Sequence, residues 1–151
     1  MSFSTGLIAA PPTPFDQAGN VRIDQIEKQA ELLIQTGVAG AFVAGTTGEC
    51  SSLTLEERLE LNRRWVDVES GTGLKIILHV GHNSLPEAKA LARQAEQIGV
   101  AAIAAMAPNY FKPTDVDELI DFTAQIASEA PSTPFYFYDI PGMTNVRLSM
   151  V

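Results

Sequence analysis

Short apolar runs alternate with amphipathic stretches along most of the chain. Near-continuous apolar runs predict buried strands, whereas apolar residues spaced three and four apart predict helices with one buried face. Ile23, Ile26, Ala30 and Leu33 show the helical spacing between the first two runs. The predicted strands are Gly6–Ala10, Gly40–Ala44, Lys75–Val80, Ala102–Ala107 and Phe135–Tyr138.

Helix start and stop signals fill the gaps between these strands. A Ser or Thr followed three residues later by Glu predicts a capping box, in which each side chain binds the other residue's backbone N–H. A glycine just after an amphipathic stretch predicts the end of a helix, because glycine readily takes the left-handed conformation. The predicted starts are Thr54 with Glu57, Ser84 with Glu87, and Thr114, and the predicted ends are Gly37 and Gly99.

Strands that alternate with single helices, without hairpin signals, predict an α/β fold with a parallel sheet. Gly-Val-Ala recurs at residues 37–39 and 99–101, which corresponds to two strand–helix units of about 31 residues each. A (β/α)8 barrel of ~250 residues has about this repeat length. A five-stranded, flavodoxin-like open sheet would show the same alternation, so the pattern alone leaves both architectures open. The stretch after Pro141 predicts a loop and the start of another helix, which reads as an interruption, because an open-sheet domain would normally end with a helix that covers the fifth strand.

Composition narrows the class of protein. Apolar residues make up 46% of the 151 residues and charged residues 19%, as in ordinary globular domains. A net charge of −8 with scattered basic residues argues against a nucleic-acid partner, because phosphate binding needs clustered Lys and Arg. The single cysteine, Cys50, excludes an internal disulfide and favours a reducing compartment. We therefore expect one cytoplasmic domain over residues 1–151, without membrane-spanning segments.

The loop after the second predicted strand carries the first candidate site. Gly45, Thr46, Thr47 and Gly48 combine tight turns with two hydroxyls and several backbone amides. Such a loop suits the binding of a carboxylate or a phosphate. The alternative is a turn closed by local hydroxyl-to-backbone bonds.

Two tyrosines stand at the edges of later loops, Tyr110 after the fourth predicted strand and Tyr138 at the end of the fifth. This position suits proton transfer, although a single tyrosine is more often a packing residue whose hydroxyl reaches water. His79 is expected to be structural, because two histidines without ligand spacing do not predict a metal site. Glycine-rich nucleotide motifs are absent, and no cofactor is expected. Trp65 and the phenylalanines are assigned to the core.

Four segments occur together in the order and spacing of one family: TPFDQAGNV (13–21), GTTGE (45–49), APNYFKP (107–113) and YDIP (138–141). On these segments the chain resembles the pyruvate-dependent class I aldolases, the family of dihydrodipicolinate synthase and N-acetylneuraminate lyase. The resemblance implies a TIM (β/α)8 barrel, usually tetrameric, of which this chain would supply a partial barrel with about five parallel strands and four helices. It also implies a Schiff base between pyruvate and a lysine on the sixth strand.

The same resemblance assigns roles to the candidate residues. Thr46 and Thr47, in the loop bounded by Gly45 and Gly48, would bind the carboxylate of pyruvate. Tyr138 would relay protons at the Schiff base and the developing alkoxide. Tyr110 would match a loop tyrosine that acts in the site of a neighbouring subunit, so we expect a homo-oligomer.

Met143 separates two branches of this family. The synthase branch usually has an arginine shortly after the YNxP segment to bind a dicarboxylic partner, whereas the lyases of sialic acid have an apolar residue, as here. We therefore favour the cleavage of sialic acid to N-acetylmannosamine and pyruvate over a synthase-like or other 2-keto acid aldolase reaction. Asn145, which stands where a glycine is common, departs from the family pattern.

None of the lysines matches the sixth-strand position that the resemblance requires: they are Lys28, Lys75, Lys89 and Lys112. We therefore expect the chain alone to lack lyase activity. Five strands do not close an eight-stranded barrel, and the open strand edge is expected to associate with another chain. A non-enzymatic half-barrel that binds a ligand or a partner is the alternative.

Overall fold

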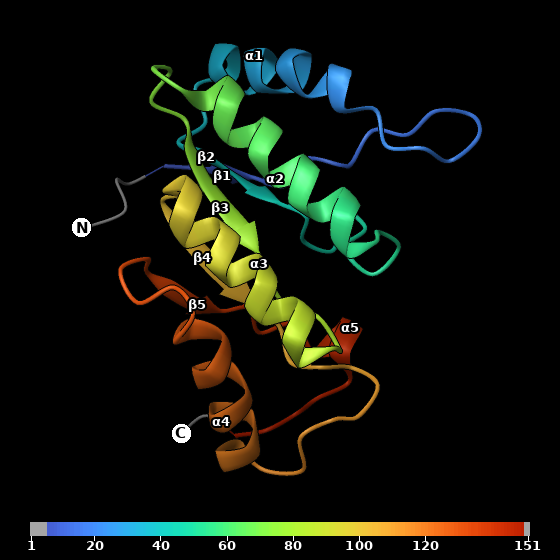
Figure 1. The fold of residues 1–151 in the computed structure, drawn as a ribbon, viewed down its shortest axis with the longest axis vertical. Helices are drawn as coiled ribbons and strands as arrows, with labels where there is room; N and C mark the ends of the chain where they lie inside the picture. Colours follow the sequence, from blue (N-terminus) through green and yellow to red (C-terminus); the bar gives the residue numbers. More distant parts are fainter. Residues whose placement is uncertain (1–5, 150–151) are drawn as a thin grey trace. The chain divides into compact units, whose positions relative to one another are not determined.

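The computed structural model describes residues 6–149, and the chain divides into two compact units, Met1–His79 and Val80–Val151. Strands and helices alternate along both units (Figure 1). The strands are β1 (Ile8–Ala9), β2 (Gly40–Val43), β3 (Lys75–His79), β4 (Ala102–Ala105) and β5 (Phe135–Phe137). The helices are α1 (Ile26–Thr36), preceded by the 3-10 turn η1 (Ile23–Gln25), then α2 (Leu55–Glu69), α3 (Leu85–Ile98), α4 (Val116–Ala127) and α5 (Pro141–Thr144).

In the first unit, β1, β2 and β3 form a parallel sheet, as predicted. Ile8 lies opposite Gly40, and Gly40 in turn lies opposite Lys75. Only a glycine fits at position 40 without a shift of the backbone, because a Cβ atom there would lie 2.5 Å from the carbonyl oxygen of Lys75. The parallel pairing brings the carboxyl ends of these strands to one edge of the sheet.

Helices α1 and α2 pack against each other, and α2 packs against β3 (Figure 1). The core of this unit is formed by apolar side chains that are almost fully buried. Trp65 is among them, as predicted. The main contributors are Ile26 and Ala30 of α1, Leu61 and Trp65 of α2, and Ile76 and Leu78 of β3.

In the second unit, β4 and β5 pair in parallel, with Ile103 opposite Phe135, and α3 packs against α4. A smaller apolar cluster joins Ala107, Leu119 and Val146, with Phe137 packed against it. Where a loop and the start of a helix were predicted, the structure has the short helix α5, which ends at Asn145 in the left-handed conformation (φ 55°), and then irregular chain to residue 149. Asparagine tolerates this conformation better than most residues, which explains why it can stand where glycine is common.

Glu96 of α3 holds the turn that leads into β5. The hydroxyl of Thr133 donates to the Glu96 carboxylate at 2.5 Å, and the backbone N–H of Ser132 donates at 3.1 Å. These bonds, that of Thr133 first, lower the pKa of Glu96 from its ordinary value. Their contribution to stability is therefore present above the ordinary pKa and is lost as the pH falls through the lowered value.

The predicted helix ends at Gly37 and Gly99 are confirmed, since both residues are left-handed (φ 73° and 74°). The capping box at Thr54 is also confirmed: the Thr54 hydroxyl accepts from the Glu57 N–H at 3.2 Å, and the Glu57 carboxylate accepts from the Thr54 N–H at 2.7 Å.

The capping box predicted at Ser84 is wrong. Ser84 is the N-cap residue of α3, but its side chain makes no capping bond. Its backbone N–H donates instead to Nδ1 of His82 at 2.9 Å, and the Glu87 carboxylate lies 3.4 Å from Nε2 of the same ring. The histidine ring thus contacts both groups that a capping box would have joined.

The start of α4 is displaced by one residue from the prediction at Thr114. Asp115 is the N-cap residue, and its carboxylate accepts from the N–H of Glu118 at 2.9 Å. Glu118 reaches back to the N–H of Thr114 at 2.7 Å. Glu118 thus makes the reciprocal bond of a capping box to Thr114, the residue before the N-cap, and not to Asp115 itself.

Within residues 6–149, no helix is long and apolar enough to cross a membrane, and no group of three or more His, Cys, Asp or Glu side chains is arranged to hold a metal ion.

The two Ser/Thr-x-x-Glu sequences give a matched test. Thr54→Ala should lower the free energy of unfolding by about 1 kcal/mol, because it removes a capping bond at the start of α2. Ser84→Ala should change it little, because the Ser84 hydroxyl caps nothing. Urea denaturation followed by circular dichroism measures both, and equal losses in the two variants would contradict this account of the helix starts.

Candidate functional site

The loop between β2 and α2 turns sharply at its start. Ala44, directly after β2, has a left-handed backbone (φ 52°), and Glu49 repeats this conformation (φ 58°). The N–H of Glu49 donates to the carbonyl oxygen of Thr46 at 3.0 Å, and the N–H of Cys50 donates to that of Gly45 at 3.2 Å. The candidate residues of the loop are therefore drawn into one compact turn.

Two glycines of this loop stand where a side chain would clash with neighbouring atoms. A Cβ atom at Gly45 would lie 2.7 Å from the ring of Phe42. A Cβ atom at Gly48 would lie 2.9 Å from Cα and 3.0 Å from the backbone nitrogen of Ala44. Backbone cannot move aside as a flexible side chain can, so the fold of the loop depends most on Gly48.

Thr13 fastens the loop from a distant part of the chain. Its hydroxyl donates to the carbonyl oxygen of Gly48 at 2.7 Å, and the bond is buried. Thr13 belongs to the TPFDQAGNV segment, but sequence reasoning gave it no role. Its partner is 35 residues away along the chain, and no local pattern indicates such a bond.

The donors that the loop presents lie at Thr47 and Gly48. Thr47 is exposed and Thr46 is half-buried. Within residues 6–149, the backbone N–H groups of Thr47 and Gly48 donate to no protein acceptor, and neither does the Thr47 hydroxyl, whereas Thr46 makes a further contact. Unused amides and a hydroxyl in one compact turn favour the interpretation of the loop as an anion site over its interpretation as a turn closed by local hydroxyl-to-backbone bonds.

The first unit also contains a buried polar pair, Arg58 and His79, that sequence reasoning missed. Arg58 of α2 is fully buried; its guanidinium donates to the carbonyl oxygen of His79 and lies 3.3 Å from Nδ1 of that ring. The Phe42 ring meets His79 edge to face at 6.2 Å between centroids. His79 is thus buried in the protein interior, as its structural assignment implied.

One signal could have identified Arg58. It shares the spacing of three, four and seven residues with Leu61, Asn62 and Trp65, which places all four side chains on one helix face. Because arginine is rarely buried, a charge on an otherwise buried face marks a special position.

In the second unit, Tyr138 follows β5 directly. Its backbone N–H donates to the carbonyl oxygen of Ala105 at 2.9 Å, which continues the β4–β5 pairing by one residue. The residue is half-buried and makes a further contact. Its backbone is therefore held at the carboxyl end of the strand.

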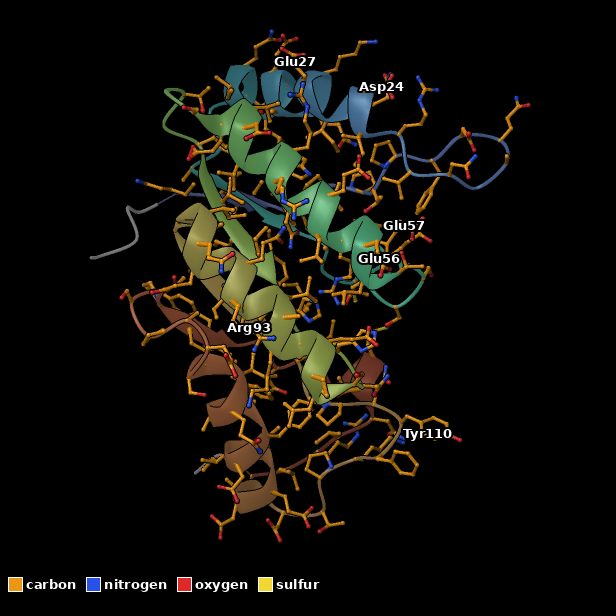
Figure 2. All side chains as sticks on the ribbon, in the orientation of Figure 1. Asp24, Glu27, Glu56, Glu57, Arg93 and Tyr110 are labelled. Carbon is orange, nitrogen blue, oxygen red and sulfur yellow. The ribbon has the colours of Figure 1, made fainter. Side chains whose placement is uncertain are left out.

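Tyr110 lies in the loop between β4 and α4 and is 77% exposed (Figure 2). Phe111, next to it, is 86% exposed, so its assignment to the core is wrong. The two rings pack only edge to face, with centroids 4.9 Å apart. The β4–α4 loop therefore holds both aromatic side chains away from the core of its own unit.

The lysines lie where the sequence placed them. Lys28 and Lys89 are on helices, Lys75 begins β3, and Lys112 lies exposed in the β4–α4 loop. Lys89 pairs with Glu129 at 3.2 Å. The structure thus draws Gly45, Thr46, Thr47 and Gly48 into one loop of the first unit and places Tyr110 and Tyr138 after β4 and β5 of the second.

Residues 3–151 match the family model described as the dihydrodipicolinate synthetase family. The chain belongs to this family. The match takes in every candidate residue described above, from the β2–α2 loop to Tyr138.

Within the dihydrodipicolinate synthetase family, several relatives are sialic acid lyases. The N-acetylneuraminate lyase of Gallus gallus is 44% identical over 95% of this chain and 47% of its own length. The solved structure of the lyase (sialic acid aldolase) from Aliivibrio salmonicida is 43% identical, with a TM-score of 0.94 over 99% of this chain and 49% of that one. A catalytic lysine mutant of the Ruminococcus gnavus sialic acid aldolase is 33% identical, with a TM-score of 0.87 over 93% of this chain and 46% of that one.

These comparisons decide the architecture that the sequence pattern left open. The chain has an α/β fold whose five strands and intervening helices match part of the TIM barrel of the family, which excludes a flavodoxin-like open sheet. The chain spans about half the length of the relatives it matches.

Thr13→Val tests the anchor of the β2–α2 loop. The valine keeps the shape of the side chain but leaves the buried Gly48 carbonyl without its donor, which should lower the free energy of unfolding by about 1–2 kcal/mol. Thr36→Val is the control, because the Thr36 hydroxyl also donates to a carbonyl, that of Leu33, but in an exposed position where water can replace it. Urea denaturation compares the two, and a loss no larger at Thr13 than at Thr36 would contradict the anchoring role.

Proposed function

We propose that this chain is the N-terminal part of a Schiff-base aldolase that cleaves sialic acid to N-acetylmannosamine and pyruvate. The observation that carries the proposal is the 44% identity to a curated N-acetylneuraminate lyase, held over 95% of the chain. In this proposal, residues 1–151 form a single barrel domain together with the remaining strands and helices of the enzyme. The protein works in the cytoplasm, where Cys50 stays reduced.

The β2–α2 loop binds the carboxylate of the 2-keto acid. The N–H groups of Thr47 and Gly48 and the hydroxyl groups of Thr46 and Thr47 supply the donors. A carboxylate accepts several such bonds, and bonds to a charged acceptor are stronger than neutral ones. The turn is fixed before the ligand arrives, so little freedom of the loop is lost on binding.

Tyr138 moves the proton. When the carbon–carbon bond of sialic acid breaks, its electrons enter the iminium formed between the keto acid and a lysine, and the neighbouring hydroxyl loses its proton as the aldehyde forms. As the Tyr138 hydroxyl at the carboxyl end of β5 takes up this proton, it passes its own proton on, and the enamine carbon that becomes the methyl group of pyruvate receives one, so the net transfer is from the sugar hydroxyl to pyruvate. The N–H bond from Tyr138 to Ala105 holds this residue against the strand.

Tyr110 acts in the site of a neighbouring copy within a homo-oligomer. Its 77% exposure fits a side chain that reaches outward from its own unit. Met143 of α5, exposed and uncharged, gives a dicarboxylic partner no ionic contact, which favours the lyase reaction over a synthase reaction.

The nucleophile must come from another segment. A catalytic lysine is named for the Ruminococcus gnavus aldolase, of which this chain spans 46%. The lysines of this chain lie on helices, at the start of β3 and in an exposed loop. Desolvation or a neighbouring cation is what makes a lysine a nucleophile, and none of the four lysines is buried, while Lys89 is paired with Glu129. We therefore expect residues 1–151 alone to have no lyase activity.

A chimera tests the proposal. Residues 1–151 are joined to the matching C-terminal part of the Aliivibrio salmonicida lyase, and N-acetylneuraminate cleavage is measured. The chimera should release pyruvate, and borohydride with pyruvate should trap a covalent adduct in the chimera but not in residues 1–151 alone, as read by mass spectrometry. Tyr138→Phe in the chimera should lower kcat by about 100-fold or more and still allow binding.

Two results would count against the proposal. An adduct on residues 1–151 alone would show that one of the four lysines is the nucleophile. A folded chimera that forms the adduct with pyruvate but leaves N-acetylneuraminate intact would contradict the sialic acid assignment and favour another 2-keto acid aldolase.

A further inference from the structure

A single side chain holds the backbone of the β4–α4 loop at Tyr110. The side-chain oxygen of Asn83 accepts from the backbone N–H of Asn109 at 2.9 Å and from that of Tyr110 at 3.1 Å. The side-chain nitrogen of Asn83 donates to the side-chain oxygen of Asn109 at 2.8 Å. Three bonds therefore join two loops that are 26 residues apart along the chain, both within the second unit.

Asn83 is itself held in place by its neighbours. It lies between His82 and Ser84, and the N–H of Ser84 donates to Nδ1 of the His82 ring at 2.9 Å. Glu87 lies 3.4 Å from the other nitrogen of that ring. The residue is therefore carried on the structured start of α3, which gives the loop a firm point of attachment.

The loop has few other means of keeping its shape. The rings of Tyr110 and Phe111 are mostly exposed and pack on each other, so no buried apolar contact fixes them to their own unit. Pro108 and Pro113 stiffen the chain at both ends of the loop but do not choose its direction. The direction of Tyr110 depends on the hydrogen bonds of its backbone.

We propose that Asn83 is a positioning residue for Tyr110: its amide fixes the backbone of the β4–α4 loop so that the tyrosine is presented outward from a fixed point. The benefit to catalysis rests on the proposed role of Tyr110 in the aldolase site. The holding of the loop backbone by Asn83 does not depend on that role. A tyrosine that acts at a distance from its own unit needs such preorganisation, because a misplaced catalytic group loses much of its effect.

The test uses hydrogen exchange of the chain 1–151, followed by NMR at the amides of Asn109 and Tyr110. Asn83→Leu, close in size but without polar atoms, should speed exchange at both amides roughly five-fold or more, the factor expected for the loss of one ordinary hydrogen bond. Asn83→Asp keeps the accepting oxygen and should restore most of the protection, since the Asn109 amide can turn to donate to it.

The matched control is Gln97→Leu, which removes an exposed amide of α3 that makes no bond in the described chain. It should leave both amides unchanged. The ring signals of Tyr110 provide a second readout, because edge-to-face contact with Phe111 shifts them, and this shift should collapse in Asn83→Leu and return in Asn83→Asp.

Unchanged exchange at both amides in a folded Asn83→Leu protein would overturn the proposal. So would equal acceleration in Asn83→Asp and Asn83→Leu, since the accepting oxygen would then have no part in holding the loop. Because these rates are measured without substrate, a failure of the proposed aldolase chemistry would leave them untouched and is seen in the chimera alone.

Discussion

The parallel pairing of strands is the constraint on which the rest of the structure depends. In the first unit, β1, β2 and β3 run in one direction, and in the second β4 and β5 do so. Parallel strands need a crossover between each pair, and a helix supplies it. The loops that follow the strands are thereby separated from those that precede them. The β2–α2 loop and the loops after β4 and β5 carry the candidate chemistry because they follow strands.

The β2–α2 loop shows how this constraint shapes a candidate binding site. The left-handed turn at Ala44 ends β2, the close approach of Gly48 to Ala44 folds the chain back, and the Thr13 hydroxyl fastens the result. Hydrogen bonds within the turn use some of its amides, whereas the N–H groups of Thr47 and Gly48 donate to no acceptor within residues 6–149. The unusual backbone is therefore part of what makes the loop a candidate anion site.

Sequence reasoning succeeded where the signal is local. The left-handed ends at Gly37 and Gly99, the capping box at Thr54 and the order of strands and helices follow from neighbouring residues, and the structure confirms them.

Prediction from the sequence failed where a third residue intervenes. Ser84 and Glu87 have the same spacing as Thr54 and Glu57, but the ring of His82 competes for both groups. Thr13, Arg58 and Asn83 were missed as structural residues because their partners lie far along the chain, and Phe111 was assigned to a core from which its loop holds it away.

In the proposed reaction this chain supplies substrate binding and proton transfer, and another segment of the barrel supplies the nucleophile. The central claim is that the β2–α2 loop recognises the carboxylate of a 2-keto acid, and an NMR titration of the isotope-labelled chain with pyruvate tests this most directly. The account predicts saturable shifts of the Thr47 and Gly48 amides with pyruvate and none with methyl pyruvate, which lacks the charge. Amides that stay unmoved by pyruvate, or that move equally with the ester, would contradict it.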